Sequence, residues 1–283
     1  MPPFIPYSRT EDGKIKGRGT VDAKSCIASQ IIAVSSLARR ALLPPSSVSL
    51  LFVVGEETNG EGMRKASSLE RQFSSVIFGE PTEGALGCGH KGLLIFKIFV
   101  EGKAAHSGYP WLGFSATRGL AKAMTALLEL EPKLPASKKF GRSTVNIGQI
   151  EGGVAPNVIA EEASASVAIR LASGTPEEVK EMILTALVET RNDTQTGGGT
   201  FDLEWLNEAY GPVDIDCDVP DFKQTVLNYG TDIPQLKGQH KRYLYGPGSI
   251  LVAHSKNEYV ASEALVKAVK DYEILLLHTL SNQ

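Results

Sequence analysis

The sequence contains few cysteines and no long apolar run. Its three cysteines, Cys26, Cys88 and Cys217, are widely separated and form no C-x-x-C pair, so neither a disulfide framework nor a cysteine zinc site is predicted. The uninterrupted apolar stretches, of which residues 50–54 are an example, are far shorter than the roughly 20 residues that a membrane helix needs. We therefore expect no membrane association, and we expect any metal to be held by carboxylate and imidazole groups.

The sequence also lacks a strong net charge of either sign. Acidic residues number 32 and basic residues 29, and no Lys/Arg run forms a stripe, which argues against nucleic-acid binding. Hydrophobic residues make up 42% and charged residues 22%, which are ordinary values for a globular protein. With 283 residues the chain is long enough for two domains. A small-molecule or peptide substrate is therefore the better expectation.

The first part of the chain alternates helix and strand patterns. Residues 22–40 have the 3.6-residue apolar rhythm of a helix, and residues 48–54 are a continuous apolar, β-branched run typical of a strand covered on both faces. A polar helical segment follows at 61–73 and a second apolar run at 76–78. This order predicts a parallel sheet flanked by helices. The apolar side chains in the rhythm of the first helix are Ile27, Ala28, Ile31, Ile32, Val34 and Ala38.

Near residue 90 the pattern changes to that of a ferredoxin-like unit, β-α-β-β-α-β. Its second helix begins with a cap, a first-turn proline and two acids at Thr175-Pro176-Glu177-Glu178. Short apolar segments and a final helix follow the unit. We therefore expect residues 91–214 to be a smaller domain inserted into a discontinuous α/β domain of residues 1–90 and 215–283. The predicted elements are strands at 93–100, 144–150, 163–171 and 200–206, and helices at 114–130, 175–188 and 257–280.

Acidic side chains follow both predicted strands of the first domain. Glu56 and Glu57 come directly after the first strand, and Glu80 comes directly after the second. The carboxyl ends of strands form the edge at which open α/β sheets bind ligands. Adjacent acids after one strand usually belong to a solvated loop. Acids after two strands of the same sheet are less easily explained by chance. The sequence therefore predicts a cluster of carboxylates at this edge.

Two further candidate ligands lie near opposite ends of the sequence. Asp22 stands at the predicted start of a helix, where it would either cap the helix or bind a metal. His254 precedes the final helix, and a lone histidine there is more often structural than a ligand. Together with Glu57 and Glu80, these residues offer oxygen donors and one imidazole, a set that suits zinc and tolerates cobalt or manganese. Glu56 is left as a candidate base.

These motifs and their order resemble the M20 family of metallopeptidases, the relatives of aminoacylase, carboxypeptidase G and succinyl-diaminopimelate desuccinylase. The resemblance extends over essentially the whole chain. It implies a zinc-exopeptidase-like α/β catalytic domain with flanking helices and an inserted ferredoxin-like lid. The matching segments are Gly17 to Lys24, Glu56-Glu57, Gly79 to Thr82, His90-Lys91-Gly92, Gly102 to Ser107, Gly152-Gly153 with Asn157, and Gly246 to Glu258.

The resemblance implies a role for each acidic residue and for His254. Asp22 would bridge two zinc ions, and Glu57 would bind one of them. Glu80 and His254 would complete opposite sides of the pair, and Glu56 would be the general base. Two metal ions about 3.5–4 Å apart acidify a shared water and polarise the scissile carbonyl. The base could then take the proton of the water and pass it to the leaving amine.

The resemblance also implies roles for the inserted domain. His106 matches a lid histidine that stabilises the tetrahedral oxyanion and that in several relatives comes from the partner subunit, so a homodimer through the lid is expected. Without the resemblance His106 would be a surface histidine. Asn157 and Arg170 match positions that hold a substrate carboxylate, for which the planar fork of arginine is suited, but Arg170 could equally form a surface ion pair. Gly248 would offer a backbone N–H to the same carboxylate or belong to a plain turn.

The sequence departs from the family at its beginning. Relatives carry a His-x-Asp motif shortly before the position of Pro2-Pro3, whose His binds zinc and whose Asp orients that ligand, and this sequence has neither. We expect an incomplete sequence first, and an inactive fragment or a non-catalytic dimerising remnant as the alternative. Similarity to secreted fungal carboxypeptidases implies secretion, and Asn192 in Asn192-Asp193-Thr194 is a glycosylation candidate. Residues 1–4 have no signal-peptide character, so a cytoplasmic protein is the other expectation.

The function implied by the resemblance is zinc-dependent hydrolysis of a C-terminal peptide bond by a carboxypeptidase. The second possibility is the deacylation of an N-acyl amino acid. Both reactions share one mechanism and differ in the shape of the pocket around the acyl side, which the sequence does not reveal.

Overall fold

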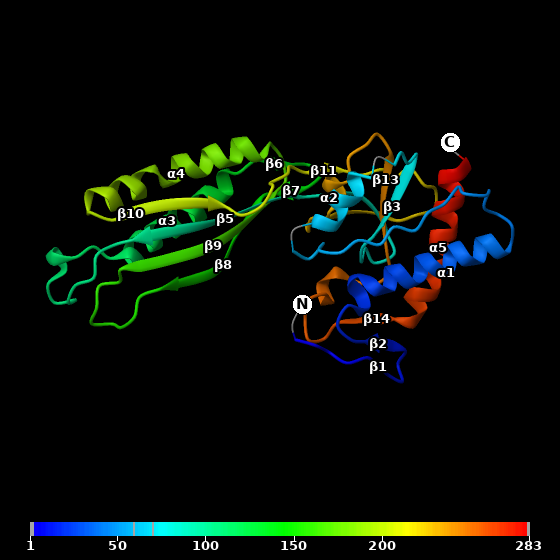
Figure 1. Cartoon of the computed structure of the whole chain (residues 1–283), viewed down its shortest axis with the longest axis horizontal. Helices are drawn as coiled ribbons and strands as arrows, with labels where there is room; N and C mark the ends of the chain where they lie inside the picture. The colour runs from blue at the N-terminus through cyan, green and yellow to red at the C-terminus, as the bar shows by residue number, and fades with distance from the viewer. Residues whose placement is uncertain (1–2, 59, 70, 282–283) are drawn as a thin grey trace. The chain divides into compact units, whose positions relative to one another are not determined.

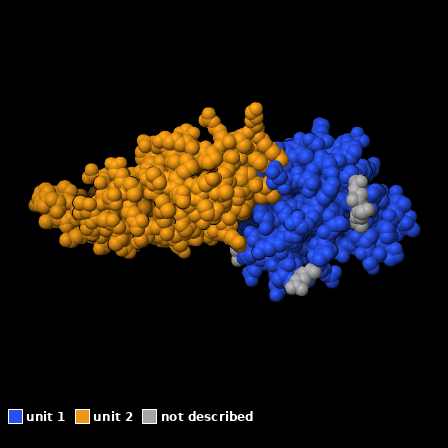
Figure 2. Space-filling view, turned by 90° about the horizontal axis from the view of Figure 1, so that it is seen from above, with its two compact units in different colours: residues 1–90, 214–227, 231–283 blue, residues 91–213, 228–230 orange. Residues whose placement is uncertain are grey.

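The computed structural model describes residues 3–58, 60–69 and 71–281 and divides into two compact units (Figure 2). Unit 1 comprises residues 1–90, 214–227 and 231–283, and unit 2 comprises residues 91–213 and 228–230. The division after residue 213 lies one residue before the predicted boundary, and residues 228–230 group with unit 2. Among the described residues, no helix combines the length and apolar character needed to cross a bilayer.

Unit 2 is a four-stranded antiparallel sheet with two helices (Figure 1). Along the chain its main elements follow the predicted β-α-β-β-α-β order, so the ferredoxin-like fold class is confirmed. The strands are arranged in the order β10-β5-β9-β8. The elements are β5 (Gly92–Glu101), α3 (Ala116–Leu130), β8 (Thr144–Gly152), β9 (Glu162–Leu171), α4 (Pro176–Thr196) and β10 (Thr200–Trp205), with the short η2 (Pro110–Leu112), η3 (Glu131–Lys133), β6 (Ala136–Ser137) and β7 (Gly141–Arg142) between them.

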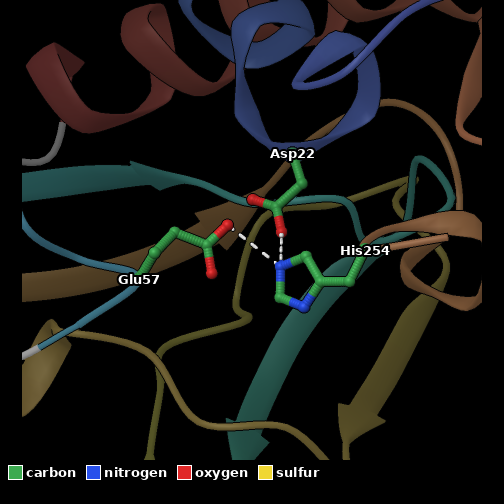
Figure 3. A group of neighbouring side chains, drawn as sticks. All are labelled: Asp22, Glu57 and His254. Atoms are coloured by element: carbon green, nitrogen blue, oxygen red, sulfur yellow. Dashed lines mark hydrogen bonds and ion pairs between the residues drawn. The ribbon is translucent and has the colours of Figure 1, made fainter. Parts of the chain in front are cut away.

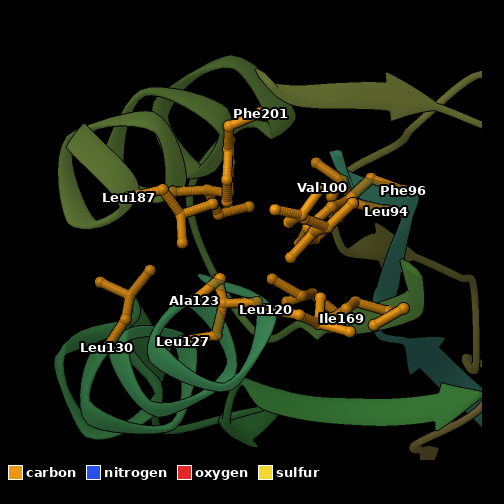
Figure 4. Packing of buried hydrophobic residues seen from close by; sticks show 14 of the residues in the cluster. Leu94, Phe96, Val100, Leu120, Ala123, Leu127, Leu130, Ile169, Leu187 and Phe201 are labelled. Atoms are coloured by element: carbon orange, nitrogen blue, oxygen red, sulfur yellow. The ribbon is translucent and has the colours of Figure 1, made fainter. Parts of the chain in front are cut away.

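The core of unit 2 lies between one face of this sheet and both helices (Figure 4). Alternate residues of β5 and β9 are buried, as expected for strands with one covered face. Helix α4 begins with a capping box, in which the Thr175 side chain accepts from the Glu178 N–H and the Glu178 side chain accepts from the Thr175 N–H. The labelled core side chains are Leu94, Phe96, Val100, Leu120, Ala123, Leu127, Leu130, Ile169, Leu187 and Phe201.

The described residues of unit 1 form two sheets, three α-helices and several short helical turns. The larger sheet has the order β11-β4-β13-β3, with β12 paired to β4, and the smaller antiparallel sheet has the order β1-β2-β14. Strands β3 and β13 run parallel, whereas β4 is antiparallel to β13. The elements are β1 (Ser8–Arg9), β2 (Lys14–Lys16), η1 (Thr20–Lys24), α1 (Ser25–Arg39), α2 (Glu61–Ser67), β3 (Ser75–Gly79), β4 (Leu86–His90), β11 (Val213–Asp214), β12 (Gln224–Leu227), η4 (Ile233–Gln235), β13 (Lys241–Tyr245), η5 (Ile250–Val252), β14 (Tyr259–Ala261) and α5 (Ser262–Ser281).

Helix α1 packs against α5, and together they cover the larger sheet (Figure 1). Its buried face is formed by small side chains and one leucine, namely Cys26, Ser29, Ala33 and Leu37. The stripe predicted from the apolar rhythm is not this face, because Ile27, Ile31 and Ile32 are exposed. Small side chains at the contact allow two helices to approach closely. The narrower, smaller-residue face of α1 is therefore the one that is buried.

Residues 48–54 do not form the predicted buried strand. They have no regular secondary structure and no β pairing, and Leu51, Phe52 and Val54 are exposed. A strand is stabilised by hydrogen bonds to a neighbouring strand, and none of the described strands pairs with this segment. The apolar run alone could not reveal whether such a neighbour exists. Helix α2 is also shorter than the predicted 61–73.

A disulfide joins Cys88 and Cys217, although the spacing of the cysteines predicted no disulfide framework. Cys88 lies in β4, and the Ile215 N–H donates a hydrogen bond to the Cys88 carbonyl at 3.2 Å. This pairing brings the chain before unit 2 beside the chain that follows it. The two cysteines are 129 residues apart in sequence, and spacing alone gives no sign of their contact. Cys26 is the free, buried cysteine.

Candidate metal centre

Three of the predicted metal ligands converge in unit 1 (Figure 3). His254 Nε2 lies 2.9 Å from Glu57 Oε1 and 3.1 Å from Asp22 Oδ2. One ligand atom of each residue lies within 4.8 Å of the others. Asp22 is the most protected of the three side chains, 11% exposed, whereas His254 is 44% exposed. The group is thus open to solvent on the His254 side.

The smaller sheet brings Asp22 and His254 together. Strand β2 pairs with β14, and Lys16 lies opposite Tyr259. Asp22 follows β2 by a few residues, and His254 precedes β14 by a similar distance. Because the two strands are antiparallel, the segment that leaves one and the segment that enters the other lie at the same end. The pairing therefore carries two ligands from opposite ends of the sequence to one place.

Asp22 does not cap a helix, so the alternative to metal binding predicted for it is wrong. Helix α1 begins at Ser25, and its N-cap is Lys24 without a side-chain hydrogen bond. Asp22 itself has extended backbone angles, φ −123° and ψ 94°. Its carboxylate points toward the His254 ring instead (Figure 3). Burial raises the pKa of Asp22, the charge of Glu57 raises it further, and His254 opposes the rise.

Glu56 and Glu57 lie in a turn rather than at the end of a strand. The turn begins at Gly55, whose φ of 82° favours glycine, and the Thr58 N–H donates to the Gly55 carbonyl at 3.2 Å. Glu57 points to His254 (Figure 3), and Glu56 lines the neighbouring cavity. The two adjacent acids therefore face different surroundings, as their different predicted roles require.

A cavity of about 980 Å³ is lined by Ala23 and Glu56, the sequence neighbours of Asp22 and Glu57, and by further carboxylates. Glu56, Glu80 and Asp232 line it. Burial is the main cause that raises the pKa of Glu56 to about 7, with the charge of Asp232 next. Burial also raises the pKa of Asp232 to about 6 and that of Glu80 well above its ordinary value. Glu80 follows β3 as predicted, but it is not among the three residues whose ligand atoms lie within 4.8 Å of one another.

Asp232 is a member of this cluster that the sequence did not reveal. It lies at the N-cap of η4, directly after Thr231, whose hydroxyl is 3.0 Å from His90 Nε2. A carboxylate in a turn before proline is ordinary turn chemistry. The sequence alone could not show that Asp232 lines the same cavity as Glu56. In the structure its charge acts on Glu56.

The raised pKa values predict that the metal-free protein loses stability as the pH rises. The folded state keeps protons on Glu56 and Asp232 at pH values at which the unfolded chain, with pKa values of 4.5 and 3.8, has released them. This stabilisation is complete below about pH 4, declines as the pH rises and is lost as the pH passes 6 to 7, which amounts to about 3 kcal/mol for each of the two groups at about 1.4 kcal/mol per pKa unit. Urea unfolding in EDTA between pH 5 and 8 measures it. A free energy of unfolding that does not depend on pH, or Glu56→Gln protein with the same dependence as the parent, would contradict the assignment.

The donor set fits a zinc ion. Two carboxylates and one imidazole already face a common point, and such sets bind zinc and accept cobalt or manganese. The mutual repulsion of the surrounding carboxylates is the kind of unfavourable interaction that a cation relieves. Asp22, Glu57 and His254 would hold the ion, and Glu80 in the adjoining cavity is the fourth candidate.

His106 lies in the loop after β5 in unit 2 and is exposed. The Gly108 N–H donates to His106 Nδ1 at 3.1 Å, so in the neutral ring the proton is on Nε2. The ring also meets Tyr109 edge-on, with ring centroids 5.9 Å apart. His106 is therefore held as a hydrogen-bond donor rather than as a base.

Asn157 and Arg170 do not lie together within one copy of unit 2, and their role in holding a substrate carboxylate stays a prediction. Asn157 is beside the His106 loop, since its carbonyl accepts from the Ser107 N–H at 3.0 Å. Arg170 is near the far end of β9, opposite Leu93. The strand between Glu162 and Arg170 alone spans roughly 25 Å at about 3.3 Å per residue. Asn157 and His106 thus lie at one end of the sheet and Arg170 at the other.

Gly248 and Asn192 are the two remaining residues for which the sequence predicted a role. Gly248 has φ of 80°, and a Cβ there would lie 2.4 Å from a Val21 methyl group, so close packing beside Asp22 requires glycine. Asn192 is exposed near the C-terminal end of α4, and Thr194 is buried with its hydroxyl donating to the Thr190 carbonyl. Glycosylation of Asn192 and a substrate contact of Gly248 stay predictions.

Comparison with known proteins identifies the family. Residues 88–195 match the M20 peptidase dimerisation domain. The chain is 48% identical to a probable carboxypeptidase of Neosartorya fischeri, over 98% of this chain and 67% of the relative. It is 48% identical to a probable carboxypeptidase of Aspergillus niger, over 98% of this chain and 70% of the relative.

A solved structure shares the fold over nearly the whole chain. The M20 family metallo-carboxypeptidase of Sulfolobus solfataricus aligns with a TM-score of 0.69 at 17% identity, covering 95% of this chain and 78% of that one. The chain spans about two thirds of the length of its Neosartorya relative. The motif order, the fold and these relatives agree: the chain belongs to the M20 family of metallopeptidases and is a hydrolase of that type.

Proposed function

We propose that this protein is a zinc-dependent carboxypeptidase that hydrolyses the C-terminal bond of a peptide. The convergence of Asp22, Glu57 and His254, with Glu56 in the adjoining cavity, is the observation that carries the proposal. The names of the fungal relatives support the choice of carboxypeptidase over the deacylation of N-acyl amino acids.

The proposed mechanism gives Asp22, Glu57 and His254 the task of holding zinc, and Glu56 the task of moving the proton. Zinc, as the two ions of the predicted mechanism, supplies Lewis acidity toward water and toward the scissile carbonyl. Glu56 takes the proton of the attacking water and delivers it to the leaving amine, a task that favours a pKa near the working pH. In the metal-free protein, burial is the main cause that raises the pKa of Glu56 to about 7.

We propose that the protein acts as a homodimer through unit 2. In such a dimer, His106 Nε2–H would donate to the carbonyl oxygen of the substrate as that oxygen gains charge. His106 and Asn157 lie at the opposite end of the unit 2 sheet from Arg170. A second copy that supplies His106 and Asn157 would let all three contact one substrate, with Arg170 binding its carboxylate as a planar fork.

Secretion is the localisation that we propose. The disulfide between Cys88 and Cys217 supports it, because such bonds persist in oxidising compartments and are rare in the cytosol. Glycosylation of Asn192 would accompany secretion.

Parallel assays test the proposal. Zinc-loaded protein is incubated with N-blocked dipeptides and with N-acetyl amino acids, and the free C-terminal amino acid is measured. We expect release from the dipeptides at least tenfold faster. Faster release from N-acetyl amino acids would identify a deacylase, and zinc binding without release from either class would identify a non-catalytic remnant.

A further inference from the structure

Glu258 is a buried carboxylate between the two segments that carry Asp22 and His254. Its side chain is 1% exposed. Glu258 Oε2 accepts from Arg18 Nη1 at 2.6 Å. Glu258 Oε1 accepts from the backbone N–H of Val21 at 3.1 Å and lies 3.5 Å from that of Asp22. The carboxylate thus joins the chain just after His254 to the backbone at Asp22.

The two carboxylate oxygens of Glu258 bind different groups. An arginine and a carboxylate in a fork-to-fork pair use both oxygens and two nitrogens. Here Oε1 is directed at the Val21 and Asp22 amides instead. Arg18 Nη2, buried, is left without a hydrogen-bond partner among the described residues. One oxygen of Glu258 therefore holds the backbone at Val21 and Asp22, and only the other pairs with Arg18.

We propose that Glu258, paired with Arg18, is a positioning residue of the zinc site: it fixes the backbone on which Asp22 is carried, relative to His254. The inference rests on the proposed function, since it assigns a role within the same site. It gives a reason for a buried charge, because a buried ion pair by itself contributes little net stability. Groups that orient metal ligands in this way change metal affinity by about 10- to 100-fold when replaced.

The proposal predicts that Glu258→Gln weakens zinc binding by about 10- to 100-fold. Glutamine keeps the shape and one acceptor oxygen, but it loses the charge that holds Arg18 and orients that oxygen. Zinc dissociation constants are measured on the whole chain by competition with a chromophoric chelator. The free energy of unfolding in EDTA is measured by urea titration on the same samples.

Asp271→Asn is the matched control. Asp271 is also a buried carboxylate of unit 1, 8% exposed, and it is held by Tyr245 and Lys267, which are not candidate zinc ligands. We expect this variant to lose stability in EDTA and to bind zinc within threefold of the parent. If Glu258→Gln does not fold, Arg18→Gln takes its place, and we expect zinc affinity to fall at least fivefold.

The outcomes distinguish the positioning role of Glu258 from the existence of the zinc site. If the parent binds zinc and Glu258→Gln, or Arg18→Gln in its place, binds within twofold of it, the positioning role is overturned and the zinc site stands. If Asp271→Asn loses as much zinc affinity as Glu258→Gln, the effect follows stability alone and the role is again overturned. If the parent binds no zinc, the proposed function fails and the positioning role fails with it.

Discussion

Replacing Glu56 by glutamine is expected to lower kcat for dipeptide hydrolysis by about 10²- to 10⁴-fold, the usual contribution of a general base. Glutamine has nearly the same shape but cannot accept the proton of the attacking water. Glu56 lines the cavity beside the ligand group and is not one of the three residues that converge on His254. We therefore expect zinc affinity to change by less than threefold.

The control is Glu61→Gln, the same chemical change five positions along the chain. Glu61 is exposed in the first turn of α2, and kcat should stay within twofold of the parent. Zinc content, kcat and KM are measured for all three proteins. If Glu56→Gln keeps kcat within tenfold of the parent, Glu56 is not the base, and Asp232 is the next carboxylate of the cavity to replace.

Removing the disulfide is expected to lower the free energy of unfolding by about 2–5 kcal/mol. The bond closes a loop of 129 residues, and in the chain-entropy model a loop of about 100 residues gives roughly 4.7 kcal/mol. A folded unit 2 already holds its two ends together, since Leu93 pairs with Tyr210. The full effect is therefore expected only when both units unfold.

The two units can be followed separately in this experiment. Both tryptophans, Trp111 and Trp205, lie in unit 2, so their fluorescence reports unit 2, whereas circular dichroism reports both units. For Cys88→Ser/Cys217→Ser we expect the dichroism transition to move to lower urea more than the fluorescence transition. Reductant should lower the parent to the stability of the variant and leave the variant unchanged. Three free thiols in the protein as isolated would contradict the disulfide.

Local patterns predicted unit 2 well because its information is local. Alternation in residues 163–171 and the cap at Thr175 depend on neighbours within a few positions. Unit 1 depends on partners that a pattern cannot reveal. Residues 48–54 have a strand composition but no pairing strand among those described, and α1 buries its small-residue face because α5 packs there.

The same distinction holds for the site. Asp22, Glu57 and His254 were predicted from motif order, and the structure brings one ligand atom of each within 4.8 Å of the others. Asp232, Glu258 and the disulfide were not predicted as functional, because each depends on a contact between distant segments. Glu258 ends the last matching motif, yet only its hydrogen bonds to the backbone at residues 21 and 22 suggest a role.

The central claim is tested most directly by following C-terminal amino acid release from an N-blocked dipeptide while zinc is added back to EDTA-stripped protein. We predict no release without metal and a rise that saturates with zinc, lost in His254→Ala at the same zinc concentration. Release that persists in EDTA, or that His254→Ala retains in full, would contradict a zinc site built on Asp22, Glu57 and His254.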